Sequence, residues 1–160
     1  MASSSQAVPQ DYHSVTPYLA VDDGARAIAF YKAAFGATEV MRMGPPGGQI
    51  GHAEIKIGDS FIMLADEFPD MKALSPTTIG GTAVLIMLYV NDVDDIFKRA
   101  LAAGGKELHP LEDKFYGDRS GTLLDPFGHM WTISTHKEDV PPEEMQRREE
   151  AFRKKMQKTG

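Results

Sequence analysis

The sequence has no cysteine among its 160 residues. This absence excludes disulfide bonds, cysteine-ligated zinc and thiol nucleophiles, and it is compatible with a reducing compartment. No apolar run approaches the ~20 residues that a membrane-spanning helix needs. The first ten residues, MASSSQAVPQ, also lack the basic and apolar regions of a signal peptide. We therefore expect a disordered leader over 1–10 and a cytoplasmic protein that does not enter a membrane.

Positive charge is also in short supply, with 17 Lys and Arg against 23 Asp and Glu and a net charge of −6. Binding to nucleic acid depends on clustered Lys and Arg that neutralise phosphates, so we expect no nucleic-acid partner. The hydrophobic content of 42% and the charged content of 25% are ordinary for a globular protein. At this length the chain can form one domain with its own hydrophobic core.

Hydrophobic periodicity predicts the same order of elements twice. Alternation with a period of two is typical of strands, whereas apolar residues three and four apart are typical of helices. The first half is predicted to form a strand, a helix and three strands over 14–21, 23–36, 38–43, 49–57 and 60–65. The second half repeats that order over 83–90, 92–104, 106–111, 121–124 and 130–135.

The two halves superimpose at a single offset of 69 residues. Val21 then meets Val90, and Gly36, which ends the first helix, meets Gly105. Neither βαβββ copy can bury its sheet alone, so the two copies are expected to pair. The predicted fold is therefore α+β: a curved eight-stranded mixed sheet around a cavity, with the helices on the convex face.

The repeat also sets the expected domain organisation, a single domain over 11–138 followed by a tail over 139–160. The parts of that domain are the half-modules 11–66 and 82–138 and the linker 67–81. Within the tail, 143–158 is predicted to form a charged helix that packs on the body or on a second subunit. Its acidic and basic residues interleave, which argues against an arm for nucleic acid.

Four strings span nearly all of the chain from Thr16 to about Val140. They are TPYLAVDDGARAIAFYKAAFGA (16–37), HAEIKIGDSFIMLADE (52–67), LYVNDVDDIF (88–97) and YGDRSGTLLDPFGHMWTISTHKEDV (116–140). Together they resemble the vicinal-oxygen-chelate superfamily of glyoxalases, bleomycin-resistance proteins and dioxygenases, and within it the PhnB-like branch. The resemblance implies paired βαβββ modules and a homodimer. It does not select one activity, because the superfamily includes isomerases, dioxygenases, thiol transferases and drug-sequestering proteins.

The resemblance also allows a test for a metal site. Metal-dependent relatives place one His or Glu on the first and the last strand of each half. The corresponding positions here are Thr16, Met63, Leu85 and Thr132. None of these side chains supplies the imidazole or carboxylate that zinc, nickel or iron sites use. We therefore expect no metal and no other cofactor.

Polar side chains elsewhere allow two interpretations each. His52 and Glu54 share one face of a predicted strand. They form either a polar or solvent-facing pair or part of a metal site, although the other histidines are scattered. Arg119 either clamps an anionic ligand or forms a salt bridge with Asp118 or Asp125.

Three aromatic residues are also open to two interpretations. Trp131 is expected in the core rather than stacked on a ligand, because it shares a strand face with Ile133. Tyr18 and Tyr89 have the parity of the cavity positions. Their hydroxyl groups either orient a ligand or bond within the core.

The leading hypothesis is a small-molecule-binding protein of the glyoxalase/bleomycin-resistance type that lacks the usual catalytic metal. The second is an enzyme: a lyase or dioxygenase-like protein with an unusual metal set around His52 and Glu54, or a metal-free isomerase with Glu54 as the base. The third is a dimeric interaction protein with a vestigial cavity and a dimerising tail helix.

The residues expected to line the cavity are Thr16, Tyr18, His52, Glu54, Phe61, Met63, Leu85, Met87, Tyr89, Arg119, Met130 and Thr132. This wall is mostly apolar and rich in methionine, which suits an adaptable hydrophobic ligand.

Overall fold

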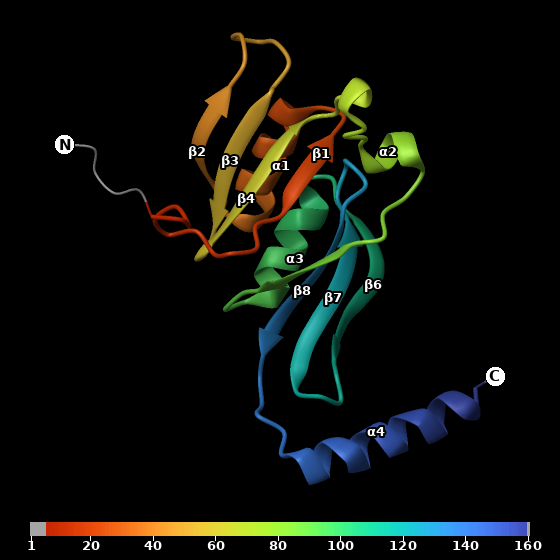
Figure 1. The fold of residues 1–160 in the computed structure, drawn as a ribbon. Coiled ribbons are helices and arrows are strands. Elements are labelled where there is room, and N and C mark those ends of the chain that lie inside the picture. The colour runs from red at the N-terminus through yellow and green to blue at the C-terminus, as the bar shows by residue number, and fades with distance from the viewer. Residues whose placement is uncertain (1–5, 160) are drawn as a thin grey trace.

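The computed structural model describes residues 6–159 and contains two copies of the predicted βαβββ order (Figure 1). The first module consists of β1 (Tyr18–Val21), α1 (Gly24–Phe35), β2 (Thr38–Met43), β3 (His52–Ile57) and β4 (Ser60–Asp66). The second consists of β5 (Leu85–Tyr89), α3 (Val93–Ala102), β6 (Lys106–Asp113), β7 (Asp118–Leu124) and β8 (Met130–His136). A short 3₁₀ turn (Pro69–Met71) and α2 (Pro76–Ile79) lie between the modules, and α4 (Pro142–Gln157) follows the second. Half of the predicted leader, 1–5, lies outside the described residues.

The eight strands form two four-stranded mixed sheets, in the orders β1-β4-β3-β2 and β5-β8-β7-β6. In each sheet the first pair is parallel and the other two pairs are antiparallel. Within residues 6–159 no strand of one sheet pairs with a strand of the other. The predicted strands are therefore all present, but a single chain does not join them into one continuous sheet.

The parallel ladders confirm the repeat at the level of single residue pairs. Tyr18 lies opposite Met63 in the first module, and Met87 lies opposite Thr132 in the second. Met87 follows Tyr18 by 69 residues, and Thr132 follows Met63 by the same predicted offset. The backbone of the second sheet therefore repeats the pairing of the first.

The two long module helices begin where short acidic side chains can cap them. Asp23 accepts a hydrogen bond from the backbone N–H of Arg26 at 3.0 Å, and Asp92 accepts one from Asp95 at 3.0 Å. Each side chain satisfies a donor that the first helical turn leaves free. At its other end α1 stops at Gly36, whose positive φ of 67° favours glycine.

The core lies where the helices cover the convex faces of the sheets. α1 packs on β2, β3 and β4, α3 packs on β6, β7 and β8, and the two helices also contact each other (Figure 1). Trp131 is buried in this core, as predicted, with its ring 4.7 Å from that of Phe35. Burial of each such side chain stabilises the fold by roughly 2–3 kcal/mol.

The tail forms the predicted helix and is anchored to the body at one point. Arg148 forms a salt bridge with Glu138 at 2.8 Å, and the ring of Phe152 lies 5.1 Å from that of Phe115 in the β6–β7 turn. None of the residues described in α4 is buried, and the helix extends away from the second sheet (Figure 1). Among the helices of residues 6–159, none has both the length and the apolar character required to cross a membrane.

Candidate functional site

The concave face of the first sheet carries the polar residues that the sequence analysis placed together. On β3, Ala53 and Ile55 are buried on the side of α1, whereas His52 and Glu54 point to the opposite face and remain half-buried. In the sheet register Glu54 lies opposite Met63, which in turn lies opposite Tyr18. Alternation along the strands therefore brings these predicted site residues onto one surface.

A chain of hydrogen bonds connects four side chains across this surface. The Tyr18 hydroxyl lies 2.8 Å from Nδ1 of His52, and Nε2 of His52 lies 3.1 Å from Oε1 of Glu54. The other carboxylate oxygen, Oε2, accepts a hydrogen bond from the Tyr12 hydroxyl. The order of the chain is thus Tyr18, His52, Glu54, Tyr12.

The electrostatics of the cluster fix which groups donate. The hydrogen bond from Tyr12, with a smaller contribution from His52, lowers the pKa of the Glu54 carboxyl although partial burial opposes it. Burial and the charge on Glu54 raise the pKa of the Tyr12 hydroxyl to about 12 and also raise the pKa of Tyr18. The carboxylate is therefore an ionised acceptor, and both phenols keep their protons near neutral pH.

Tyr12 is the member of this cluster that sequence reasoning missed. It precedes β1 and belongs to no periodic segment, so hydrophobic patterning gives no signal for it. Its ring stacks on Phe61 of β4 with the centroids 4.1 Å apart, and this contact directs its hydroxyl to Glu54. Only the folded sheet shows this partnership, because 42 residues separate Tyr12 from Glu54.

The concave face of the second sheet carries a different polar group. Nδ1 of His136 lies 2.7 Å from the buried Asp118, and Nε2 lies 2.8 Å from Asp139. The Tyr89 hydroxyl donates to the other oxygen of Asp118 at 3.2 Å. These two carboxylates, Asp118 first, raise the pKa of His136 above its ordinary value of 6.5. Carboxylates on both ring nitrogens favour the imidazolium form.

Apolar side chains on β5 lie beside that polar group and face the solvent. Leu85, Met87 and Tyr89 are 51%, 46% and 59% exposed. On the neighbouring β8, Thr132 is buried and its hydroxyl pairs with that of Thr122 at 2.8 Å. The predicted cavity wall of the second module is therefore largely uncovered in the single chain.

One groove of about 710 Å³ brings predicted residues of both modules together. It contains Thr16 and Phe61 from the first module and Met87 and Tyr89 from the second. His52, Glu54, Leu85 and Thr132 do not line this groove. The two halves of the predicted site thus meet in part, while His52, Glu54, Leu85 and Thr132 lie on the separate concave faces.

Arg119 is not on a concave face. Its neighbours Asp118 and Ser120 point to the concave side of β7, whereas its guanidinium binds both carboxylate oxygens of Asp94 on α3, at 2.8 and 2.9 Å. A weaker contact reaches Asp113 at 3.4 Å. A salt bridge was foreseen for this residue, but with Asp118 or Asp125. The placement of Arg119 in the cavity wall is therefore wrong, because strand alternation turns it toward the helix.

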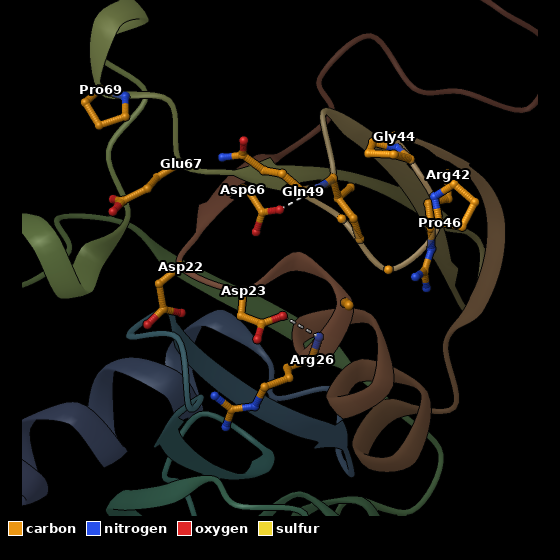
Figure 2. Close-up of a pocket in the computed structure, with 15 residues that line it drawn as sticks. Asp22, Asp23, Arg26, Arg42, Gly44, Pro46, Gln49, Asp66, Glu67 and Pro69 are labelled. Carbon is orange, nitrogen blue, oxygen red and sulfur yellow. Dashed lines mark hydrogen bonds between the residues drawn. The ribbon is translucent and has the colours of Figure 1, made fainter.

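A second pocket, of about 940 Å³, lies at the start of α1 and is lined by several charged residues (Figure 2). The carboxylates of Asp23, Asp66 and Glu67 already accept hydrogen bonds within the chain. Asp66 accepts from the backbone N–H groups of Gly24 and Ile50, and Asp23 caps α1. The contacts of Asp66 connect the β2–β3 loop to the first turn of the helix. This pocket therefore serves the fold, and we place the candidate site on the concave faces.

Comparison with known proteins identifies the family. A model of the Glyoxalase/Bleomycin resistance protein/Dioxygenase superfamily matches residues 12–133. The chain belongs to this superfamily. An uncharacterized protein of Mycobacterium tuberculosis is 44% identical over 136 residues, which cover 83% of this chain and 80% of that protein.

Solved structures of other proteins share the fold. TioX from Micromonospora sp. ML1 is 31% identical with a TM-score of 0.63, over 78% of this chain and 98% of its own. A structure titled putative 3-demethylubiquinone-9 3-methyltransferase, PhnB protein, from Bacillus cereus is 22% identical with a TM-score of 0.58, over 77% and 99%. The family model and the likeness to TioX confirm the predicted resemblance to the superfamily, and the Bacillus cereus structure shares the fold.

The residues present do not fit the metal site of metal-dependent glyoxalase-superfamily members. The four projected positions are Thr16, Met63, Leu85 and Thr132. The Thr132 hydroxyl is hydrogen-bonded to that of Thr122. Methionine and leucine offer no imidazole or carboxylate. In the described part of the chain, no three His, Cys, Asp or Glu side chains gather closely enough to hold a metal ion. We therefore derive no chemistry through a metal at these positions.

Proposed function

We propose that this protein binds a small organic molecule on its concave faces and does so without the metal ion of its metal-dependent relatives. The observation that carries the proposal is the composition of that surface. Threonine, methionine and leucine stand at the projected metal positions, and exposed apolar side chains stand beside them. Such a surface suits hydrophobic contact with a ligand rather than coordination.

The exposure of β5 supports this function. Three consecutive concave-face side chains, Leu85, Met87 and Tyr89, are each about half exposed. A contiguous apolar surface of this kind favours coverage by a ligand or by another protein surface. Methionine adapts its shape to irregular ligands because its side chain is unbranched and polarizable.

The groove between the modules supports it as well. Its volume of about 710 Å³ lies within the range of about 300–1,000 Å³ that is typical of small-molecule pockets. Ile86, Met87 and Leu88 of β5 give the groove an apolar wall, and Phe61, whose ring stacks on Tyr12, lines it on the side of the first module. A ligand with an apolar ring and one or two oxygen atoms would match this wall and the polar side chains of Ser60 and Asn91 in the same lining.

The test is direct binding of a neutral aromatic diketone, 1-phenylbutane-1,3-dione, by isothermal titration and by the shift in Tm. We expect saturable binding and a Tm that rises with ligand concentration, because the ligand stabilises the native state. Met87→Lys should weaken the affinity at least about tenfold, since the charge would have to be desolvated against the ligand. Met71→Lys changes a largely exposed methionine of the 3₁₀ turn and should bind like the wild type.

Equal affinity in the two lysine variants, or no binding at all, would contradict the proposal. Stoichiometric zinc, nickel or iron in the purified protein would contradict its metal-free part.

We also propose that two copies assemble as a homodimer through β1 and β5. Each of these strands lies at the edge of its sheet and pairs on one side only. Val15 and Val84, which precede the two strands, are strongly exposed. An uncovered edge strand beside exposed apolar residues favours pairing with another chain. Pairing of β1 with β5 of a second copy would complete the continuous curved sheet that the repeat predicts.

A further inference from the structure

We propose that Tyr18, His52, Glu54 and Tyr12 form a proton relay, in which Tyr18 takes a proton from the bound molecule and the site catalyses keto–enol isomerisation of a neutral carbonyl compound. This inference rests on the proposed function, because it concerns a ligand on the same concave face. It adds an activity and assigns a role to each member of the hydrogen-bonded chain.

The direction of the relay follows from the hydrogen bonds. Both oxygens of Glu54 act as acceptors, one toward Tyr12 and one toward His52. Nε2 of His52 must therefore carry the proton and donate it. In the neutral ring the other nitrogen, Nδ1, then has a free lone pair. The Tyr18 hydroxyl lies 2.8 Å away and donates its hydrogen bond to this nitrogen.

The consequence is that Tyr18 presents its oxygen lone pairs, rather than its proton, to a ligand. Its side chain is 53% exposed on the concave face, whereas His52 and Glu54 are half-buried behind it. Tyr18 is thus the member of the relay that a ligand would touch. The arrangement resembles a nucleophile–histidine–carboxylate triad in its bonding, with a phenol at the outer end.

The step balances without a cofactor. A C–H bond next to a carbonyl group of the ligand breaks, and its electron pair moves toward the carbonyl oxygen, so that an enolate forms. The proton forms a new O–H bond on Tyr18, while the original phenol proton moves to Nδ1 of His52. The resulting imidazolium is paired with the Glu54 carboxylate. Tyr18 then donates a proton to the enolate oxygen, which gives the enol, and Nδ1 of His52 returns its proton to Tyr18, which restores the relay.

Glu54 itself is a poor candidate for the base, which differs from the expectation at the sequence level. Its two oxygens are already occupied, and the hydrogen bond from Tyr12 lowers the pKa of its carboxyl. A carboxylate stabilised in this way has little tendency to take up a proton. Glu54 is therefore a positioning residue that holds His52 in one tautomer, and Tyr12 positions Glu54.

The surrounding side chains indicate the class of substrate. Phe61 and Met63 provide apolar contacts next to the relay, so a neutral molecule is favoured over an anion. Lys56 lies on the same face of β3, with its ammonium group 5.2 Å from the centre of the Phe61 ring. A positive charge there would attract the oxygen on which negative charge develops. The substrate class is thus a neutral aryl ketone with an acidic C–H group.

The test follows the enol of 1-phenylbutane-1,3-dione by ultraviolet absorbance after dilution from organic solvent into buffer containing the full-length protein. We expect ketonisation above the rate in buffer alone. Tyr18→Phe and His52→Gln should lower this acceleration by about 100-fold or more, the usual contribution of acid–base groups. Binding by Tyr18→Phe should change less than threefold. Tyr116→Phe, outside the relay, is the matched control and should behave like the wild type.

Nitrogen-15 NMR of the His52 ring shows which of its two nitrogens carries the proton. A purely structural role for the cluster would not require one particular tautomer. The wild type should show the tautomer with the proton on Nε2, and Tyr12→Phe should shift the ring toward a mixture of tautomers. Binding of the diketone without any acceleration would overturn the relay and leave the proposed binding function intact. Absence of both binding and acceleration would overturn both. An unchanged rate in Tyr18→Phe, or His52 with its proton on Nδ1, would also overturn the relay.

Discussion

Two histidines in this protein occupy opposite electrostatic situations, although both lie on concave strand faces. His52 lies between an ionised carboxylate and a phenol, so one of its nitrogens can remain an acceptor. His136 lies between two carboxylates, Asp118 and Asp139, and both of its nitrogens act as donors. The same residue type is thus suited to passing a proton at one position and to holding one at the other.

The first prediction concerns the charge of His136. Its pKa, measured from the ring proton shifts by NMR, should exceed 6.5, because the bonds to Asp118 and Asp139 stabilise the imidazolium. Its contribution to stability is fully present below the pKa of the unfolded chain and is lost as pH rises through the raised folded value. Asp139→Asn should lower the pKa of His136, and His136→Gln should flatten this part of the pH–stability curve. A pKa at or below 6.5 in the wild type would contradict the assignment.

Among the secondary-structure elements, α4 contributes least to the body. Its described residues include none that is buried, and its main contacts are the Arg148–Glu138 salt bridge and the packing of Phe152 on Phe115. Surface ion pairs of this kind are worth only about 0–1 kcal/mol. By contrast, β1 and β5 carry unpaired edges beside exposed apolar residues.

The second prediction separates these two elements as the source of dimerisation. Deletion of residues 141–160 should leave the oligomeric state unchanged and lower the free energy of unfolding by no more than about 2 kcal/mol, since it removes one surface ion pair and one aromatic contact. Light scattering after size-exclusion chromatography and denaturant unfolding provide the measurements. Conversion of a wild-type dimer to a monomer by this deletion would show that the tail helix, and not the sheet edges, joins the copies.

For the whole molecule, Asp125 is a buried polar link between the two modules. It accepts from the Tyr31 hydroxyl of α1 at 2.6 Å and from Trp131 Nε1 of β8 at 2.9 Å. Its other oxygen accepts from the backbone N–H groups of Phe127 and His129, each at 2.9 Å. One carboxylate therefore holds the first helix, the last strand and the turn before that strand in register.

The third prediction is that Asp125→Asn destabilises the protein by about 3 kcal/mol, because an amide nitrogen would face donors that are then left buried and unsatisfied. Asp70→Asn is the matched control, since Asp70 is exposed in the 3₁₀ turn and should change stability little. Thermal and denaturant unfolding measure both variants. A cost below 1 kcal/mol for Asp125→Asn would mean that this carboxylate contributes little to joining the modules.

The fold could be predicted from the sequence because periodicity and the repeat are properties of neighbouring residues. The limits of β2 at Thr38 and Met43 follow directly from that pattern. The start of β7 does not, since Asp118, Arg119 and Ser120 show no apolar alternation and join the strand through backbone pairing with β8 and β6. β1 begins later than predicted, at Tyr18, directly after a proline that has no N–H group to donate.

For the candidate site, the sequence could predict only which residues share one face of a strand. His52 and Glu54 could be placed on one face because they are two residues apart. The partners of the site residues could not, since they depend on contacts between distant segments. Tyr12 reaches Glu54 across 42 residues, and Arg119 finds Asp94 across 25. Hydrogen-bonding partners that are this far apart in the chain cannot be identified from the hydrophobic periodicity of the sequence.

The repeat of the backbone is not a repeat of chemistry. By register, the position of Glu54 in the first sheet corresponds to Thr122 in the second, and the position of Tyr18 corresponds to Met87. A ligand on the first face would therefore meet proton-handling groups, whereas the matching positions of the second face offer a methionine and a threonine hydroxyl. Such an environment distinguishes the two hydrogens of a prochiral methylene group. Exchange with deuterated water should then label one enantiotopic position in preference to its mirror-related partner.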